Sequence, residues 1–220
     1  MKLVICGEGG LGHEVLDLIC QLMNEGLKVY EEIIFLDDTP GKKQYGNYKV
    51  LPSRDIYKEY DPDSTKFVVA IGEPIYRIKF IREIKSEGFE FETLIHPTAY
   101  VGLNSVIGDG TVVQRGAFIS CDCTIGANCL FQAYSSVGHD SVIQDNCVIS
   151  SNVAISGGVH IGGNTYIAVG SCIKQGIYIG TDTVVGMGSM VLRDLPDHVI
   201  AMGNPARPMK NKDHSRVFHS

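Results

Sequence analysis

The sequence predicts a small α/β domain with a parallel sheet over residues 1–97, followed by a parallel β-helix with a closing segment over residues 98–220. One observation is that strand-like and helix-like segments alternate up to about Pro97. Another is that every sixth residue from Val101 to Val191 is apolar. Alternating strands and helices indicate a parallel sheet. A fixed short period indicates a repeat architecture.

Three apolar runs in the first domain predict buried strands, at residues 2–7, 32–38 and 67–72. Two amphipathic segments, residues 12–26 and 74–88, predict helices that each end at a glycine. The stretch GEGGLG between the first strand and first helix matches G-x-G-x-x-G, a turn that brings backbone N–H groups close to a phosphate. A complete two-half dinucleotide fold is considerably longer. The domain is therefore Rossmann-like but small.

The repeat of the second part keeps one register over sixteen units. A mostly small residue stands four places after each apolar one, and glycine often stands one place after it. We interpret the apolar and small residues as pointing inward and the glycine as allowing the turn. The repeated apolar residues are Val101, Ile107, Val113, Ile119, Ile125, Phe131, Val137, Ile143, Ile149, Ile155, Ile161, Ile167, Ile173, Ile179, Val185 and Val191.

Composition excludes several classes of function. The formal charge of -6 and the lack of a long basic run argue against nucleic acid or a membrane surface as a partner. No apolar stretch approaches the roughly 18 residues that span a bilayer, so we expect a cytoplasmic protein. Seven cysteines occur without a C-x-x-C pair. Cys123, Cys129 and Cys147 fall in the small inward position, which predicts core packing.

Several motifs resemble those of a known family. The hexapeptide repeat, the tail IAMGNPARP and the junction TLIHPTAYVG look like left-handed β-helix acyltransferases. More narrowly, CGEGGLGHE, FLDD, AIGEPIYR and SSVGHDSVI resemble bacterial sugar-nucleotide N-acetyltransferases, a group that includes the bacillosamine-pathway acetyltransferase and is related to sialic-acid O-acetyltransferases. The resemblance runs from Lys2 to about Pro208. It implies a left-handed coil, a homotrimer, and acetyl-CoA bound between neighbouring β-helices, with no metal.

The implied reaction is transfer of acetyl from acetyl-CoA to the amine of a nucleotide-linked amino sugar, a 4-amino-6-deoxyhexose, for a surface glycan such as the O-antigen of lipopolysaccharide. The resemblance makes His139 the general base and Asp140 the residue that raises its basicity. From spacing alone, the pair also fits an exposed corner histidine beside an exposed aspartate. Alignment from His139 puts the N–H that binds the oxyanion on Gly157, where a glycine needed only for the turn is the alternative.

Further contacts to acetyl-CoA carry over to Gly157, Val169 and Met187. Some relatives have a histidine at the position of Val148 and an asparagine at the position of Gln132. Since valine has no polar side-chain atoms, we expect one polar contact of the site to be lost or replaced.

The first domain should bind the nucleotide sugar. Gly12 and His13 open the first helix, whose N-terminus favours a phosphate. Asp37, Asp38 and Gly72 follow strands at the edge where ligands of open α/β sheets bind, and Arg77 would pair with a phosphate. Each of these residues also has a structural alternative. His13 could be a helix cap, Asp37 and Asp38 could form a turn, and Arg77 could be a solvated charge on its helix.

Four other functions compete with this one. O-acetylation of a sugar such as sialic acid needs the same base. An NAD-dependent dehydrogenase fits the glycines but leaves the repeat unexplained. A zinc enzyme of carbonic-anhydrase type needs three histidines, whereas the repeat holds His139 and His160. A purely structural β-helix does not account for the nucleotide-like domain.

Overall fold

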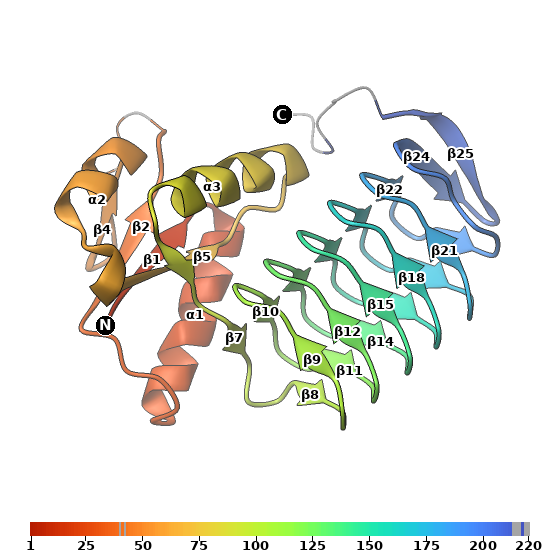
Figure 1. Ribbon diagram of the computed structural model, residues 1–220, viewed down its shortest axis with the longest axis horizontal. Coiled ribbons are helices and arrows are strands. Elements are labelled where there is room, and N and C mark those ends of the chain that lie inside the picture. The colour runs from red at the N-terminus through yellow and green to blue at the C-terminus, as the bar shows by residue number, and fades with distance from the viewer. Residues whose placement is uncertain (40, 42, 213–216, 218–220) are drawn as a thin grey trace.

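The chain folds into two domains that lie side by side, as Figure 1 shows for the computed structural model. The structure describes residues 1–39, 41, 43–212 and 217. An α/β domain contains the N-terminus, and a column of stacked coils extends from its side to a C-terminal hairpin. The alternating strands and helices of the sequence therefore correspond to the α/β domain, and the six-residue repeat corresponds to the column of coils.

The N-terminal sheet has six strands in the order β3-β4-β2-β1-β5-β6. The three expected strands are its centre: β1 (Lys2–Cys6) pairs in parallel with β2 (Glu32–Leu36) and β5 (Thr65–Val69). The two expected helices are α1 (Gly10–Asn24) and α3 (Pro74–Ser86). The elements beyond those expected are β3 (Gln44–Tyr45), β4 (Tyr48–Leu51), α2 (Ser53–Glu59), a 3-10 helix (Pro62–Ser64) and β6 (Glu90–Phe91).

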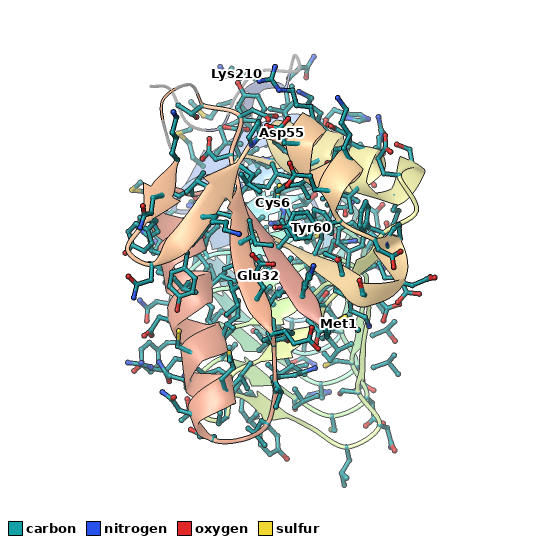
Figure 2. All side chains as sticks on the ribbon, turned by 90° about the vertical axis from the view of Figure 1, so that its left-hand side faces the viewer. Met1, Cys6, Glu32, Asp55, Tyr60 and Lys210 are labelled. Carbon is teal, nitrogen blue, oxygen red and sulfur yellow. The ribbon has the colours of Figure 1, made fainter. Side chains whose placement is uncertain are left out.

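Alternate residues of β1 are buried on opposite faces of the sheet. Leu3 and Ile5 pack in one cluster with α1, whereas Val4 and Cys6 pack in another with α2 and α3. The cluster around α1 also includes outward residues of the β-helix, so α1 is enclosed between the sheet and the coils. Figure 2 looks onto this domain and shows Met1 at the amino end of β1, with Cys6 toward the end where Asp55 of α2 lies.

From Leu94 to Val191, each coil of the β-helix contributes two-residue strands to three parallel faces, with coils 18 residues apart in register, and an antiparallel hairpin extends face I at the C-terminal end. Face I comprises β7 (Leu94–Ile95), β10 (Val112–Val113), β13 (Leu130–Phe131), β16 (Val148–Ile149), β19 (Tyr166–Ile167), β22 (Val184–Val185), β24 (Val199–Gly203) and β25 (Ala206–Asn211). Face II comprises β8 (Tyr100–Val101), β11 (Phe118–Ile119), β14 (Ser136–Val137), β17 (Ala154–Ile155), β20 (Cys172–Ile173) and β23 (Met190–Val191). Face III comprises β9 (Val106–Ile107), β12 (Thr124–Ile125), β15 (Val142–Ile143), β18 (His160–Ile161) and β21 (Tyr178–Ile179).

The interior is built as the period predicts, because the repeated apolar residues from Val113 to Val191 form one buried cluster. The small residues also point inward, and several do more than fill space. Ser141 Oγ donates to the carbonyl of Ser156, fifteen residues on. Cys129 and Cys147 donate through their thiols to the corresponding carbonyls, with S···O distances of 3.2 Å. Burial raises the pKa of the Cys147 thiol well above its ordinary value.

The glycines at the second place of the unit have a different role from the one expected. The left-handed conformation occurs two places later, at every sixth residue from Asn104 to Gly188. The Gly138 backbone has a negative φ, and a Cβ there would overlap the amide of Gly157 in the next coil. This glycine is needed because the stacked coils approach closely, and the turn itself is made mostly by Asn, Asp or Gly in the left-handed region.

The junction between the domains is fixed by hydrogen bonds. Strand β7 pairs with β10, so the β-helix ladder begins at Leu94, just before the boundary expected after residue 97. His96 Nδ1 accepts the backbone N–H of Thr98, and Nε2 lies 2.7 Å from Gln21 Oε1 on α1. These contacts require the neutral imidazole with its proton on Nε2. Burial, and secondly the charge of Arg115, lower the pKa of His96.

Between Asn104 and Gly188, Tyr134 is the one corner residue in the left-handed conformation that is not Asn, Asp or Gly, and its φ is 60°. We expect Tyr134→Asn to raise the free energy of unfolding by about 1 kcal/mol, since asparagine tolerates this conformation. Asn152 occupies the same place one coil later, so Asn152→Tyr should lower it by a similar amount. Urea unfolding midpoints measure both changes. Destabilisation by Tyr134→Asn would mean that contacts of the tyrosine ring outweigh the backbone strain.

The pH dependence of stability should report on His96. Its folded pKa lies below that of the unfolded chain, about 6.5, so the unfolded state binds a proton first as the pH falls. The stabilisation is therefore present above pH 6.5 or so and is lost as the pH drops from there through the folded pKa. We expect wild type to lose more unfolding free energy than His96→Gln between pH 7.5 and 5, measured by urea titration. Equal losses would contradict this assignment.

Candidate active site

His139 and Asp140 form a hydrogen-bonded pair at the corner between β14 and β15. Nδ1 of the imidazole lies 2.6 Å from Asp140 Oδ2, and the two side chains are 55% and 66% exposed. Asp140 takes the left-handed corner position, with a φ of 58°. A carboxylate on Nδ1 holds the proton there and leaves the Nε2 lone pair free to accept another. The pair thus has the geometry of an oriented general base at a surface corner.

Gly157 stands one coil after His139, in the same corner position. A Cβ on Gly157 would lie 2.7 Å from His139 Nε2 and 2.8 Å from Cε1. With any other residue at position 157 the imidazole would have to leave this position, because real Cβ atoms essentially never come so close to another heavy atom. Gly157 does not have a positive φ, so its lack of a side chain serves the histidine and not the turn.

The amide of Gly157 is also available as a donor. At the equivalent place of other corners, side-chain oxygens accept the N–H: Gln132 accepts that of Ser151, and Asp145 accepts that of Ala127. In the part of the chain that the structure describes, the Gly157 N–H donates no hydrogen bond. A free amide beside a base is suited to stabilise a developing oxyanion.

A second concave site, which we call the edge pocket, lies at the carboxyl edge of β1, β2 and β5. It has a volume of about 850 Å³, and its lining includes Gly9, Gly10, Asp37, Asp38 and Gly72. Gly9 is the N-cap of α1 and provides no capping side chain, and the first turn carries no acidic residue. The positive end of this 15-residue helix therefore faces the pocket without a carboxylate of its own.

The carboxylates of Asp37 and Asp38 accept hydrogen bonds within the domain as well as lining the edge pocket. Asp37 accepts the N–H groups of Glu8 and Thr39, at 3.0 and 2.8 Å. Asp38 accepts both the N–H and the hydroxyl of Ser53 at the start of α2. The aspartates thus hold together the loops that follow β1 and β2, and they line the cavity at the same time.

Gly12 and His13 lie next to the edge pocket but are not among its lining residues. Gly12 is buried, and a Cβ there would overlap the carbonyl of Gly7, so this glycine allows α1 to approach the end of β1. His13 Nε2 lies 3.0 Å from Glu8 Oε1, and its ring stacks on Tyr45 at 3.7 Å between centroids. His13 instead lines a neighbouring cavity of about 500 Å³ between α1 and the corners that carry Gln114 and Ser151.

Arg77 occupies a position that differs from the expected one. Its side chain is 1% exposed and donates to the carbonyls of Val69, Ile71 and Asn128, at 2.8, 3.0 and 2.5 Å. Burial lowers the pKa of its guanidinium to about 10, so it remains charged at neutral pH. The guanidinium connects the loop after β5 to a corner of the β-helix. Arg77 is not among the residues that line the edge pocket.

The residues expected to contact acetyl-CoA do not gather in one chain. Val169 and Met187 are exposed at the corners between faces I and II, whereas His139 and Gly157 lie at the corners between faces II and III. Val148 is buried in the cluster around α1, and Gln132 accepts the amide of Ser151. A single chain brings together His139, Asp140 and Gly157, and separately Asp37, Asp38 and Gly72.

Three residues of α3 that line the edge pocket were not singled out from the sequence. Tyr76, Lys79 and Phe80 lie on one side of α3 and line the pocket there. Their spacing of three and four residues places them on one helix face, and this spacing is the sequence pattern that could have identified them.

Over the described residues, no group of three or more potential metal-ligating side chains is found. No helix in that part of the chain is long and apolar enough to cross a membrane.

Both domains match known family models. Residues 2–84 match the PglD N-terminal domain, and residues 122–157 match six repeats of the bacterial transferase hexapeptide. A UDP-N-acetylbacillosamine N-acetyltransferase of Bacillus subtilis is 33% identical over 113 residues. That alignment covers 51% of this chain and 50% of the relative, so it spans about half the length of each protein.

Solved structures match nearly the whole chain. The acetyltransferase domain of PglB from Neisseria gonorrhoeae, solved in complex with acetyl coenzyme A, has a TM-score of 0.86 at 28% identity and covers 94% of this chain and 98% of its own. A perosamine N-acetyltransferase of Caulobacter crescentus, a histidine-to-asparagine variant in complex with CoA and GDP-perosamine, has a TM-score of 0.85 at 30% identity. It covers 96% of this chain and 98% of its own.

An α/β domain joined to a left-handed β-helix of hexapeptide units defines the class of hexapeptide-repeat acyltransferases, and both the fold and the resemblance expected from the sequence are confirmed. Within that class, the chain belongs to the sugar N-acetyltransferases, as the whole-length match to the perosamine enzyme shows.

Replacing Arg77 should reveal its structural role. In Arg77→Met three buried carbonyls lose their donor, and we expect the free energy of unfolding to fall by about 2–4 kcal/mol. Arg82, an exposed residue of the same helix, gives the control Arg82→Met, which should change it by less than about 0.5 kcal/mol. Denaturant titration measures both values. An unchanged midpoint for Arg77→Met would contradict the role.

Proposed function

We propose that the protein transfers the acetyl group of acetyl-CoA to the amino group of a nucleotide-linked amino sugar. The observation that carries this proposal is the corner where Asp140 orients the His139 imidazole and Gly157 leaves both space for the ring and a free amide. The similar proteins include a UDP-N-acetylbacillosamine N-acetyltransferase and a perosamine N-acetyltransferase solved with CoA and GDP-perosamine, which supports the amine as acceptor.

In the proposed reaction, the sugar amine attacks the thioester carbonyl directly, without an acyl-enzyme. His139 Nε2 accepts the proton that the amine loses, and Asp140 keeps the other ring nitrogen protonated. The Gly157 N–H donates to the oxygen that becomes negative in the tetrahedral intermediate. The carbon–sulfur bond then breaks, and coenzyme A leaves as a thiol after taking a proton. An N-acetylated sugar nucleotide is the second product.

We assign the nucleotide to the edge pocket. Its volume suits a nucleoside diphosphate, and its lining combines the N-terminus of α1 with carboxylates able to accept from a base N–H or a ribose hydroxyl. Asp37, Asp38 and Gly72 would contact the nucleotide. Gly12 and His13 would shape the start of α1, beside the neighbouring cavity that extends toward the β-helix.

A complete site requires more than one copy of the chain, and we propose a homotrimer with acetyl-CoA between neighbouring β-helices. The residues expected at the coenzyme, Val169 and Met187, are exposed at a different corner from His139. Face II between these corners has an uncharged outward surface, which favours packing against another copy. Its outward residues are Tyr100, Phe118, Ser136, Ala154, Cys172 and Met190.

We propose a surface glycan as the destination of the acetylated sugar. Amino-deoxy sugars linked to nucleotides are precursors of surface glycans such as the O-antigen of lipopolysaccharide, and we propose a role of that kind.

We also propose a cytoplasmic location. The seven cysteines are all free thiols, which supports a reducing compartment.

The decisive experiment measures thiol release from acetyl-CoA against a panel of 4-amino-sugar nucleotides with different bases and ring configurations, together with free sialic acid. We expect His139→Ala to lower kcat by about 10²–10⁴-fold, as for loss of a general base. Gly157→Ala should also lower it, because the new methyl group displaces the imidazole.

His160 gives a matched control, since it is a histidine of the same β-helix that stacks on Tyr178 on face III. His160→Ala should keep wild-type activity. A folded His139→Ala variant as fast as wild type would overturn the role of the base. Release of thiol with sialic acid alone would overturn the amine acceptor in favour of O-acetylation.

A further inference from the structure

The edge pocket contains an unusual balance of charge for a site that would accept a nucleoside diphosphate. Three carboxylates line it, from Asp37, Asp38 and Glu73. Within the described lining, Lys79 is the single basic side chain. A dianionic ligand approaching three carboxylates is repelled unless positive groups offset them. Among the lining residues that the structure describes, Lys79 is the side chain whose charge attracts such a ligand.

Lys79 and Arg77 have different roles although they belong to the same helix. Residues two apart on a helix do not face the same side. Arg77 turns into the core, where three carbonyls occupy its guanidinium. Lys79 is exposed, and its Nζ lies 5.6 Å from the centre of the Phe80 ring, which also lines the pocket. Among the residues that the structure describes, Lys79 forms no ion pair with a carboxylate.

The carboxylates nearby are partly satisfied by other groups. Asp37 accepts two backbone N–H groups, and Asp38 accepts the N–H and hydroxyl of Ser53. These bonds leave the ammonium of Lys79 available. The N-terminus of α1, with its Gly9 cap, supplies a second positive element in the same lining.

We propose that Lys79 binds the diphosphate of the nucleotide sugar, acting with the N-terminal amides of α1, and that it has the role expected from the sequence for Arg77. This inference rests on the proposed function, because it takes the edge pocket as the nucleotide site. The contact is a charge-assisted hydrogen bond from an ammonium to a phosphate oxygen. The contribution of Lys79 to affinity therefore depends on the phosphates of the ligand and not on its base.

Calorimetry on the wild-type protein with UDP, GDP and dTDP tests the proposal without the acetyl-transfer reaction. For whichever nucleotide binds, Lys79→Met should weaken the diphosphate about tenfold, a typical effect of losing a charge-assisted bond. The matching nucleoside without phosphates should bind wild type and variant equally. Lys79→Arg should restore most of the affinity, because it restores the charge.

Two controls separate this effect from general damage. Lys85→Met removes a lysine from the last turn of the same helix, away from the pocket lining, and should leave diphosphate affinity unchanged. Coenzyme A carries its own diphosphate and should bind wild type and Lys79→Met equally, because we assign it to another site. The difference between wild type and Lys79→Met should shrink as NaCl is raised, because salt screens an exposed charge.

The outcomes distinguish the two proposals. If wild type binds a diphosphate and Lys79→Met binds it equally well, the role of Lys79 is overturned and the nucleotide site stands. If Lys79→Met weakens nucleoside and diphosphate alike, the lysine shapes the pocket and does not bind phosphate, which also overturns the proposal. If wild type binds none of the three diphosphates, the nucleotide-sugar substrate itself is overturned.

Discussion

The structure depends on one interaction, the parallel hydrogen-bond ladder that joins each coil of the β-helix to the next at a spacing of 18 residues. This ladder fixes which residues are stacked at every corner. His139 lies against Gly157 because they are 18 residues apart, and the same register places Gly138 against the backbone of the next coil. A one-residue shift would move the repeated apolar residues out of the interior, and it would also separate the His139 imidazole from the free amide of Gly157. Core packing and the geometry of the proposed active site are thus set by the same constraint.

The α/β domain is attached so that the edge pocket keeps a defined position relative to that ladder. Helix α1 is buried between the N-terminal sheet and face I. His96 bonds to Gln21 on α1, and Arg77 bonds to Asn128 at a coil corner. The Arg77 guanidinium also holds the carbonyls of Val69 and Ile71, which belong to the strand and loop beside the edge pocket. These contacts make the pocket wall and the β-helix parts of one packed structure.

The sequence was sufficient for the architecture because periodicity reports directly on burial. Six-residue spacing predicted the coils and their interior, and alternating elements predicted the central strands and both long helices. It was less informative for α3, where isoleucines recur at every third residue, at Ile75, Ile78, Ile81 and Ile84. The buried stripe in fact runs through Pro74, Arg77, Ile81 and Ile84, so a charged residue occupies a core position. Because Arg77 lies on the buried side of α3, Lys79, two residues further on, lies on another side of the helix and lines the edge pocket. The steric roles of Gly138 and Gly157 could not be predicted from the sequence, because each is crowded by atoms of a neighbouring coil that are 18 or 19 residues away in the chain.

The thiols inside the β-helix are protected from reaction with the thioester of acetyl-CoA. Cys123, Cys129 and Cys147 replace hydroxyls in the inward positions and make similar bonds to the next coil. Attack on a thioester requires a thiolate that can reach the carbonyl carbon. These sulfurs are enclosed by the coils, and burial keeps Cys123 and Cys147 protonated. A protein that works beside acetyl-CoA can therefore contain them without becoming acetylated on sulfur or forming mixed disulfides with the released coenzyme.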